Sequence, residues 1–220
     1  MLRADLVKTE PSTVSPGATR ARSAKRARIL DAAIAVFART GYHDARVSDI
    51  AREAKIAYGL VYHYFRNKEE ILETIFEERW TGFVETVEAI ADAPSRTEEK
   101  LEAIAALILG AYRLRRDWVK VFVLEIQRSS RFAEPGQLRA VGRFFQAVAK
   151  ILRAGQARGE LRGDLDPEVA GYVFIGGLEI VITALVLGVI RESDVEPEGY
   201  APKVARTVVE IFLRGIGEAA

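Results

Sequence analysis

Residues 47–68, VSDIAREAKIAYGLVYHYFRNK, predict two short helices joined by a turn. Apolar residues of the first helix recur three and four positions apart and give it one apolar stripe: Val47, Ile50, Ala51 and Ala54. In the second helix, Leu60, Val61 and Phe65 can point inward, which leaves tyrosines and a basic end outside. A short docked helix with such a face suits the DNA major groove. An ordinary helical hairpin with tyrosines at the edge of a core has the same spacing, so spacing alone leaves both interpretations open.

The residues around this stretch extend a pattern with fixed offsets. Upstream it comprises Arg28-Ile29-Leu30, Ala32-Ala33, Phe37-Ala38 and Gly41-Tyr42. Downstream it comprises Gly59, Val61-Tyr62, Tyr64-Phe65 and Lys68-Glu69. From about Arg26 to Leu72 the chain therefore resembles the N-terminal domain of the TetR family of one-component bacterial transcription regulators.

The resemblance implies an all-α fold of about nine helices, with a three-helix helix-turn-helix domain before a larger helical domain for ligand binding and dimerisation. Residues 1–22 would be a disordered basic arm, 23–68 the DNA-binding domain and 69–220 the ligand-binding and dimerisation domain. The residues expected to contact an operator are Ser48, Arg52, Ala57, Tyr58, Tyr62, Tyr64 and Lys68. By position in the motif, the last three would contact phosphates, whereas Arg52, Ala57 and Tyr58 would face bases.

Three positions depart from the family pattern. Lys55 stands in the turn where glycine is usual, and a left-handed backbone there would be slightly strained. Leu60 replaces a common threonine, which removes one polar group that could contact DNA. Arg46 replaces a threonine or serine that often caps the second helix, so this cap would shift to Ser48 or be absent.

The near-neutral net charge of +1 hides a segregation along the chain. Residues 1–68 hold 13 Lys and Arg against 6 Asp and Glu, a net charge of +7. Residues 69–220 hold 19 against 25, a net charge of −6. A basic front end is expected of a phosphate-binding domain. A helical protein that only binds other proteins or a membrane, the rival class, does not need this split.

No enzyme activity, cofactor or metal site is expected from the residues. The chain has no cysteine, which excludes disulfides and fits a reducing cytoplasm. Both histidines, His43 and His63, fall inside the DNA-binding motif without metal-ligand spacing. Residues 1–22 lack the apolar segment of a signal peptide. A basic arm there could reach along DNA or remain a solvated tail.

Further helical patterns run from 68 to 91, 97 to 115, 117 to 131, 136 to 158, 167 to 190 and 201 to 215. The stretch 172–190 is nearly all apolar and approaches the length that spans a bilayer, but Glu179 lies at its centre. A buried helix or a subunit interface explains it better, and no membrane is expected. The resemblance places a homodimer interface on the last two helices, where charges at Ile182 and Leu185 would break it.

The downstream part resembles, more loosely, the fatty-acid-degradation (FadR-like) regulators within the TetR family. The matching residues are those from Leu124 to Ser130, followed by Gly155, Gly159-Glu160-Leu161 and Asp166. This implies a long-chain acyl-CoA effector, with the acyl chain in an apolar interior and arginines at the phosphates. The expected ligand-binding residues are Trp80, Phe83, Val84, Val87, Tyr112, Phe122, Arg128, Arg131, Phe144, Phe145 and Phe174. A different apolar small molecule, sensed for efflux or another pathway, remains the alternative.

Overall fold

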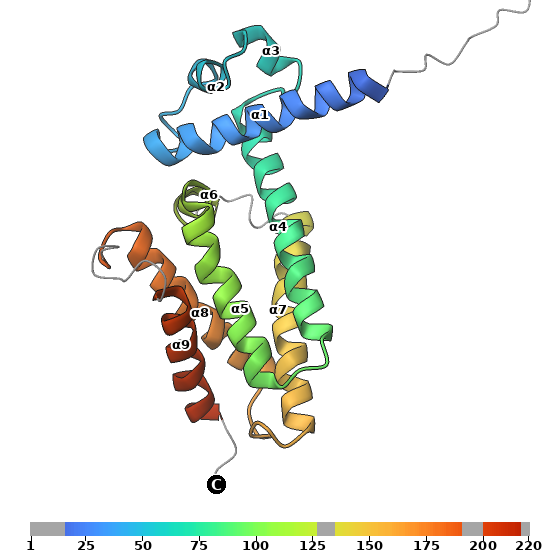
Figure 1. Ribbon diagram of the computed structural model, residues 1–220, viewed down its shortest axis with the longest axis vertical. Coiled ribbons are helices and arrows are strands. Elements are labelled where there is room, and N and C mark those ends of the chain that lie inside the picture. The colour runs from blue at the N-terminus through green and yellow to red at the C-terminus, as the bar shows by residue number, and fades with distance from the viewer. Residues whose placement is uncertain (1–15, 127–134, 191–199, 217–220) are drawn as a thin grey trace, which may run out of the picture.

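The computed structural model describes residues 16–126, 135–190 and 200–216, and every element in these ranges is helical. Helices α1 (Pro16–Thr40), α2 (Val47–Glu53) and α3 (Tyr58–Tyr62) form a head (Figure 1). Helix α4 (Lys68–Asp92) starts in the head and runs into a larger body (Figure 1). The body is completed by α5 (Thr97–Leu114), α6 (Arg116–Val121), the π-helix η1 (Phe122–Ile126), α7 (Pro135–Ala157), α8 (Pro167–Val186) and α9 (Tyr200–Ile216). The all-α expectation is confirmed.

Each helix of the head contributes to the hydrophobic core, which continues from the head into the body. The residues buried there include Ile29, Ala33, Phe37, Ile50, Ala51, Val61 and Phe65. Helices α2 and α3 are too short to be stable alone. They are held because their apolar stripes pack against α1 and against each other.

Helix α1 begins at Pro16. Residues 16–22, which the sequence places in a disordered arm, are therefore helical. The segment lacks apolar periodicity and its described side chains are exposed. Alanine and arginine have high intrinsic helix propensity, so a helix already nucleated in the head can extend without burial. Propensity therefore sets this boundary.

In the body, α4 packs against α7, α7 against α8 and α5 against α9. Side-chain caps fix two starts, since Asn67 accepts a hydrogen bond from the Glu70 amide at 2.8 Å and Asp166 accepts from the Glu168 amide at 2.8 Å. The expected single helix over 117–131 is instead α6 followed by the π-helix η1. Helix α8 ends at Val186, four residues early, because Gly188 adopts a φ of +70° just after its C-cap.

Of the described helices, α8 is the one whose length and composition would allow it to cross a membrane. One face of it packs inside the body, where Phe174, Leu178, Ile182 and Leu185 are buried. Ile182 and Leu185, expected at a subunit interface, are thus core residues of their own chain. The opposite face carries exposed apolar side chains, which include Val173 and Ile180.

Candidate DNA-binding surface and ligand cavity

Helix α3 presents two tyrosines on the outer side of the head. The side chains of Tyr58 and Tyr62 lie one turn apart and are 53% and 46% exposed. Their rings meet edge to face at 5.2 Å and their hydroxyls are 2.9 Å apart. This hydrogen bond raises the pKa of the Tyr62 phenol above its ordinary value. Val61, on the opposite side of α3, is buried in the core and anchors the helix. Tyr58 and Tyr62 therefore form a fixed polar edge that can face DNA.

The turn before α3 has the strained backbone that the sequence predicts. Lys55 adopts a φ of 53°, the left-handed region that favours glycine. Arg28 from α1 donates to the Lys55 carbonyl oxygen at 3.2 Å and supports this conformation. At the start of α2, the Arg46 amide donates to the Asp49 carboxylate at 3.3 Å. The Arg46 side chain makes no capping hydrogen bond in place of the usual threonine, so Asp49 supplies the side-chain contact at this helix start, and Ser48 lies exposed inside the helix.

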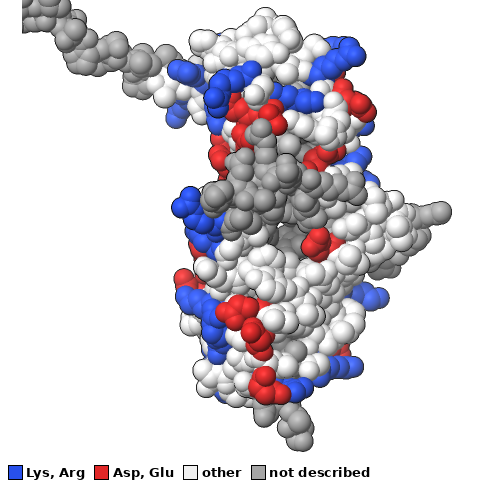
Figure 2. Space-filling model, turned by 180° about the vertical axis from the view of Figure 1, so that it is seen from behind, with Lys and Arg blue, Asp and Glu red and all other residues white. Residues whose placement is uncertain are grey.

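Three further residues expected at the operator lie on the accessible part of the head. Ala57 and Arg52 are exposed, and the Arg52 guanidinium pairs with the Asp49 carboxylate at 2.6 Å. Tyr64 is half-buried against the core. Figure 2 shows Lys and Arg flanking a mostly uncharged outer end of the head on the face in view. Contacts of these residues with DNA stay a prediction.

Lys68, whose expected phosphate contact stays a prediction, makes three contacts within the head. Its ammonium donates to the carbonyl oxygens of Tyr42, His43 and Ala45 at 2.5, 2.9 and 2.9 Å. It also lies 4.5 Å from the centre of the Tyr42 ring. An ammonium has three donors, and here all three are used by the loop between α1 and α2. Lys68 therefore connects that loop to the start of α4 by hydrogen bonds.

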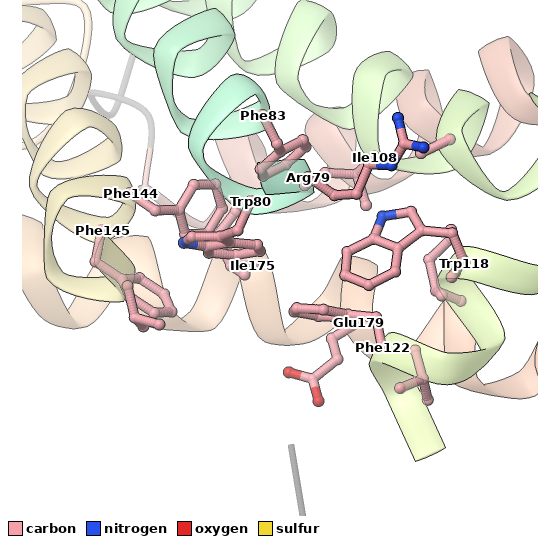
Figure 3. A pocket seen from close by; sticks show the side chains of 15 residues that line it. Arg79, Trp80, Phe83, Ile108, Trp118, Phe122, Phe144, Phe145, Ile175 and Glu179 are labelled. Carbon is pink, nitrogen blue, oxygen red and sulfur yellow. The ribbon is translucent and has the colours of Figure 1, made fainter. Parts of the chain in front are cut away.

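A cavity of about 330 Å³ lies in the body between α4, α5, α6, η1, α7 and α8. Figure 3 shows its aromatic walls, with Arg79, Trp80 and Trp118 among the labelled side chains. The lining side chains are mostly apolar: Trp80, Phe83, Ile108, Ala111, Trp118, Val119, Phe122, Val123, Val141, Phe144, Phe145, Ile175 and Ile182, with Arg79 and Glu179 as the charged members. This volume falls at the lower end of the roughly 300–1,000 Å³ typical of ligand sites.

Stacked rings organise one wall of this cavity. The rings of Trp80 and Phe122 are nearly parallel, at 9°, with centres 5.2 Å apart. Phe144 meets Trp80 edge to face at 5.5 Å. Because Trp80 belongs to α4 and Phe122 to η1, the stack joins two elements that each contact the head.

The cavity holds three polar groups with different environments. Arg79 donates to the Asp31 carboxylate of α1 at 2.9 Å. Glu179 has no ion pair or hydrogen bond within the described part of the chain. The indole nitrogen of Trp80 is buried and has no hydrogen-bond partner among the described residues.

The expected ligand-binding residues divide into three groups. Those that line the cavity are Trp80, Phe83, Phe122, Phe144 and Phe145. Those that pack in the core instead are Val84, Val87, Tyr112 and Phe174. Tyr112 donates to the Leu185 carbonyl oxygen at 3.1 Å, and the Phe174 ring lies 5.1 Å from Phe212. The third group, Arg128 and Arg131, lies outside the described residues. Sequence reasoning missed Ile175, Glu179 and Ile182 as lining residues, although their spacing of four and three places them on one helical face.

Two basic residues of α7, Arg143 and Lys150, form ion pairs with α4, whereas Arg139 is exposed. Arg143 forms a two-pronged ion pair with Glu88 at 2.9 and 2.6 Å, and Lys150 pairs with Asp92. The hydrogen bonds from these cations lower the pKa of both carboxyl groups. The pairs join α7 to α4 across a surface hollow that they line themselves.

The later residues of the FadR-like resemblance, from Gly155 to Leu161, lie at a corner of the fold between α5 and α7. Glu160 accepts from the Thr97 amide at 3.0 Å and from Arg158 at 2.8 Å. A side chain at Gly155 would lie 2.5 Å from the Thr97 hydroxyl, so only glycine fits there without a shift. Gly159 has a φ of +71° at the end of α7. None of these residues lines the cavity, so the resemblance here reflects architecture.

Two family models match successive parts of the chain. The model of bacterial regulatory proteins of the tetR family matches residues 29–75. The model of the C-terminal region of YsiA-like proteins matches residues 76–195, more than half of the 220 residues. The chain belongs to the TetR family. The head is thus the family's DNA-binding domain and the body its C-terminal domain.

Individual TetR-family proteins are similar to this chain along almost their whole length. The fatty acid metabolism regulator protein of Bacillus subtilis (strain 168) is 30% identical over 196 residues, which cover 87% of this chain and 95% of that protein. The crystal structure of FadR from Bacillus subtilis in complex with stearoyl-CoA has a TM-score of 0.73 and 26% identity, covering 86% and 98% of the chains. The fatty acid degradation regulator FadR from Bacillus halodurans gives 0.74 and 26%, covering 87% and 95%. The resemblance to the FadR-like group is confirmed.

Proposed function

We propose that this TetR-family protein is a repressor that binds a pseudo-palindromic operator as a homodimer and is released by long-chain acyl-CoA. The observation that carries this proposal is the aromatic cavity beside α4, the helix that begins in the DNA-binding head. An acyl chain needs such an apolar interior. The similarity to a FadR that was crystallised with stearoyl-CoA supports the same ligand class.

On the DNA side, α3 is the recognition helix. Tyr58 and Tyr62 supply its polar edge, and Ala57 at its N-cap leaves room for a base to approach. Ser48, Arg52 and Tyr64 remain assigned to the operator through the family motif. In a dimer the two recognition helices would enter successive major grooves, about 34–36 Å apart or a multiple of it.

Two contacts connect the cavity wall to the head. Arg79 in the wall pairs with Asp31 of α1 at 2.9 Å. In η1, Glu125 follows Phe122 by three residues and accepts from the Tyr42 amide at 3.2 Å. A ligand that separates the stacked rings would therefore shift α4 and η1 relative to α1. Such a ligand releases DNA only if it binds the shifted arrangement more tightly than the DNA-bound one.

Arg128 and Arg131 remain the proposed partners of the CoA phosphates. Replacing both with alanine should weaken the response to acyl-CoA and leave operator binding intact, because the basic head is a separate domain. Arg143 and Lys150 are poorer candidates, since a phosphate would have to displace Glu88 or Asp92 from them.

The proposal is tested by titrating stearoyl-CoA into a complex of the protein with an operator selected from a random DNA pool. Release is expected at micromolar ligand, whereas free CoA and DNA of unrelated sequence serve as controls without effect. A complex that persists well above micromolar stearoyl-CoA would refute the acyl-CoA effector and leave the repressor assignment standing.

A lipophilic cation is the second candidate effector. The observation that favours it is Glu179, an exposed carboxylate among the residues that line a cavity with aromatic walls. Aromatic faces and a carboxylate together attract cations. Replacing Glu179 with glutamine should weaken release by such a cation several-fold, and leave release by stearoyl-CoA unchanged or stronger. Weaker release by stearoyl-CoA together with unchanged release by the cation would exclude a cation as the effector.

A further inference from the structure

Trp80 carries a polar group that the fold leaves without a partner. Its side chain is 9% exposed, and its indole Nε1 finds no hydrogen-bond acceptor among the described residues. A buried donor without an acceptor destabilises a protein, and such donors are rare in native structures. The second tryptophan of the cavity, Trp118, is only partly buried, and its indole nitrogen is not a buried donor without a partner.

The neighbours of Trp80 fix the direction of this N–H. Phe122 stacks on the indole ring, and Phe144 meets it edge to face. Figure 3 shows the indole nitrogen on the side where Phe144 and Phe145 line the cavity. Aromatic rings are weak acceptors for an N–H, and a carbonyl oxygen readily replaces them.

The other polar groups of the cavity leave Trp80 as the buried donor available to a ligand. The Arg79 guanidinium is only partly buried and donates to Asp31, and the exposed Glu179 carboxylate offers only acceptors when ionised. A ligand carboxylate at this N–H would bury an ionised group among aromatic rings, which costs more free energy than burying a neutral oxygen. A neutral carbonyl oxygen satisfies the indole N–H without this cost.

We infer that Trp80 is a specificity-determining residue whose Nε1–H donates a hydrogen bond to a neutral carbonyl oxygen of the effector. The inference rests on the proposed function, in which that oxygen is the thioester carbonyl of acyl-CoA. The bond selects a thioester over the corresponding thioether and over a free fatty acid. The aromatic rings around Trp80 contact the adjoining methylene groups.

The test compares stearoyl-CoA with its thioether analogue S-octadecyl-CoA, in which a methylene replaces the carbonyl. Dissociation constants are measured by calorimetry for the parent protein, Trp80→Phe and Trp118→Phe. Trp80→Phe should weaken stearoyl-CoA about tenfold, the usual effect of one well-placed hydrogen bond, and change the thioether less than about threefold. Trp118→Phe makes the same substitution in the same cavity and should affect both ligands equally. Equal losses of both ligands in Trp80→Phe would overturn the inference.

A second measurement does not require Trp80 to be replaced. In the Trp118→Phe protein, Trp80 is the sole remaining tryptophan, so its indole proton gives one assignable NMR signal. Stearoyl-CoA should move this signal downfield and the thioether should not, and identical shifts would contradict the hydrogen bond. If the parent protein binds neither ligand, the acyl-CoA proposal fails, whereas binding without this discrimination removes only the role of Trp80.

Discussion

Two lysines of the head have backbone roles that their charges do not reveal. Lys55 occupies a left-handed position in the turn, and its carbonyl oxygen accepts a hydrogen bond from Arg28. The ammonium of Lys68 is surrounded by three carbonyl oxygens of the α1–α2 loop. Both lysines lie in the DNA-binding motif, yet the contacts within the head explain them without DNA.

Replacing Lys68 with methionine should destabilise the protein, because three backbone carbonyl oxygens lose a charged donor. We expect the free energy of unfolding to fall by about 2 kcal/mol, measured by urea titration. Where the variant is folded, the salt dependence of operator binding should match that of the parent. Arg66→Met, which removes only an exposed pair with Glu70, is the control and should cost less than about 1 kcal/mol. A salt slope reduced by about one unit in Lys68→Met would restore the phosphate contact.

Glu160 gives the corner between α5 and α7 a dependence on pH. Hydrogen bonds from Arg158 and Thr97 lower the pKa of its carboxyl group to about 2. A lowered pKa in the folded state means that the ionised group stabilises the fold above the ordinary pKa of 4.5 and loses this effect as the pH falls toward 2. The difference in unfolding free energy between the parent and Glu160→Gln should therefore be constant from pH 7 to 5 and shrink below pH 4.5. Arg158→Gln should weaken the same dependence, and a difference that stays flat down to pH 3 would contradict it.

Among the helical elements, α4 and η1 lie between ligand and DNA. Helix α4 supplies Trp80 to the cavity and Arg79 to the contact with α1. The short π-helix η1 supplies Phe122 to the cavity and Glu125 to the α1–α2 loop. A π-helix often marks a functional site, because its extra residue per turn redirects side chains. Here Phe122 and Glu125 contact different domains although they are three residues apart.

Replacing Glu125 with alanine should weaken the coupling between the effector and the operator. The Tyr42 amide loses its acceptor, so a shift of η1 is transmitted less completely to the loop. The ratio of operator affinities with and without saturating stearoyl-CoA should fall by a factor equivalent to roughly 0.5–2 kcal/mol, while operator affinity without ligand changes little. Glu125→Gln retains an acceptor oxygen and should behave like the parent. An unchanged ratio in the alanine variant would show that coupling passes elsewhere.

At the scale of the whole molecule, the body exposes an apolar surface on α8 and α9. Its members are Val169, Tyr172, Val173, Ile180, Leu187 and Ile211, each more than half exposed. An apolar surface of this kind marks an interface. Gly176 and Gly177 lie on the same helix. A Cβ atom added at Gly176 would meet nothing within 4 Å, and one at Gly177 would meet only Val208 at 3.9 Å, so a second copy could approach closely.

Ile180→Glu should therefore convert a homodimer to a monomer and abolish tight operator binding. Ile180 is 69% exposed, so the substitution leaves the core of its own chain intact. The measurement is light scattering at micromolar concentration, with the helix content checked by circular dichroism. Ile211→Glu on α9 should act in the same direction. A parent protein that is monomeric, or an Ile180→Glu protein that remains dimeric, would contradict this interface.

The sequence by itself determined the helical elements, the DNA-binding motif and the family. These depend on local properties: apolar spacing, capping residues, and Gly or Pro at boundaries act over a few residues. The left-handed turn at Lys55 was predictable for the same reason, because one backbone position decides it. The exposed tyrosines of α3 were predictable because Val61 identifies the buried face.

Only the tertiary structure decided which side chains line the cavity and which cations are available. An apolar helical face supplies core and cavity wall alike, so Val87 and Phe83, four residues apart on α4, could not be separated by spacing. The partners of Arg143 and Lys150 lie 55 and 58 residues away, and those of Lys68 lie 23 to 26 residues away. Such pairings depend on how α4 packs against α7 and against the head, and no local pattern encodes that packing.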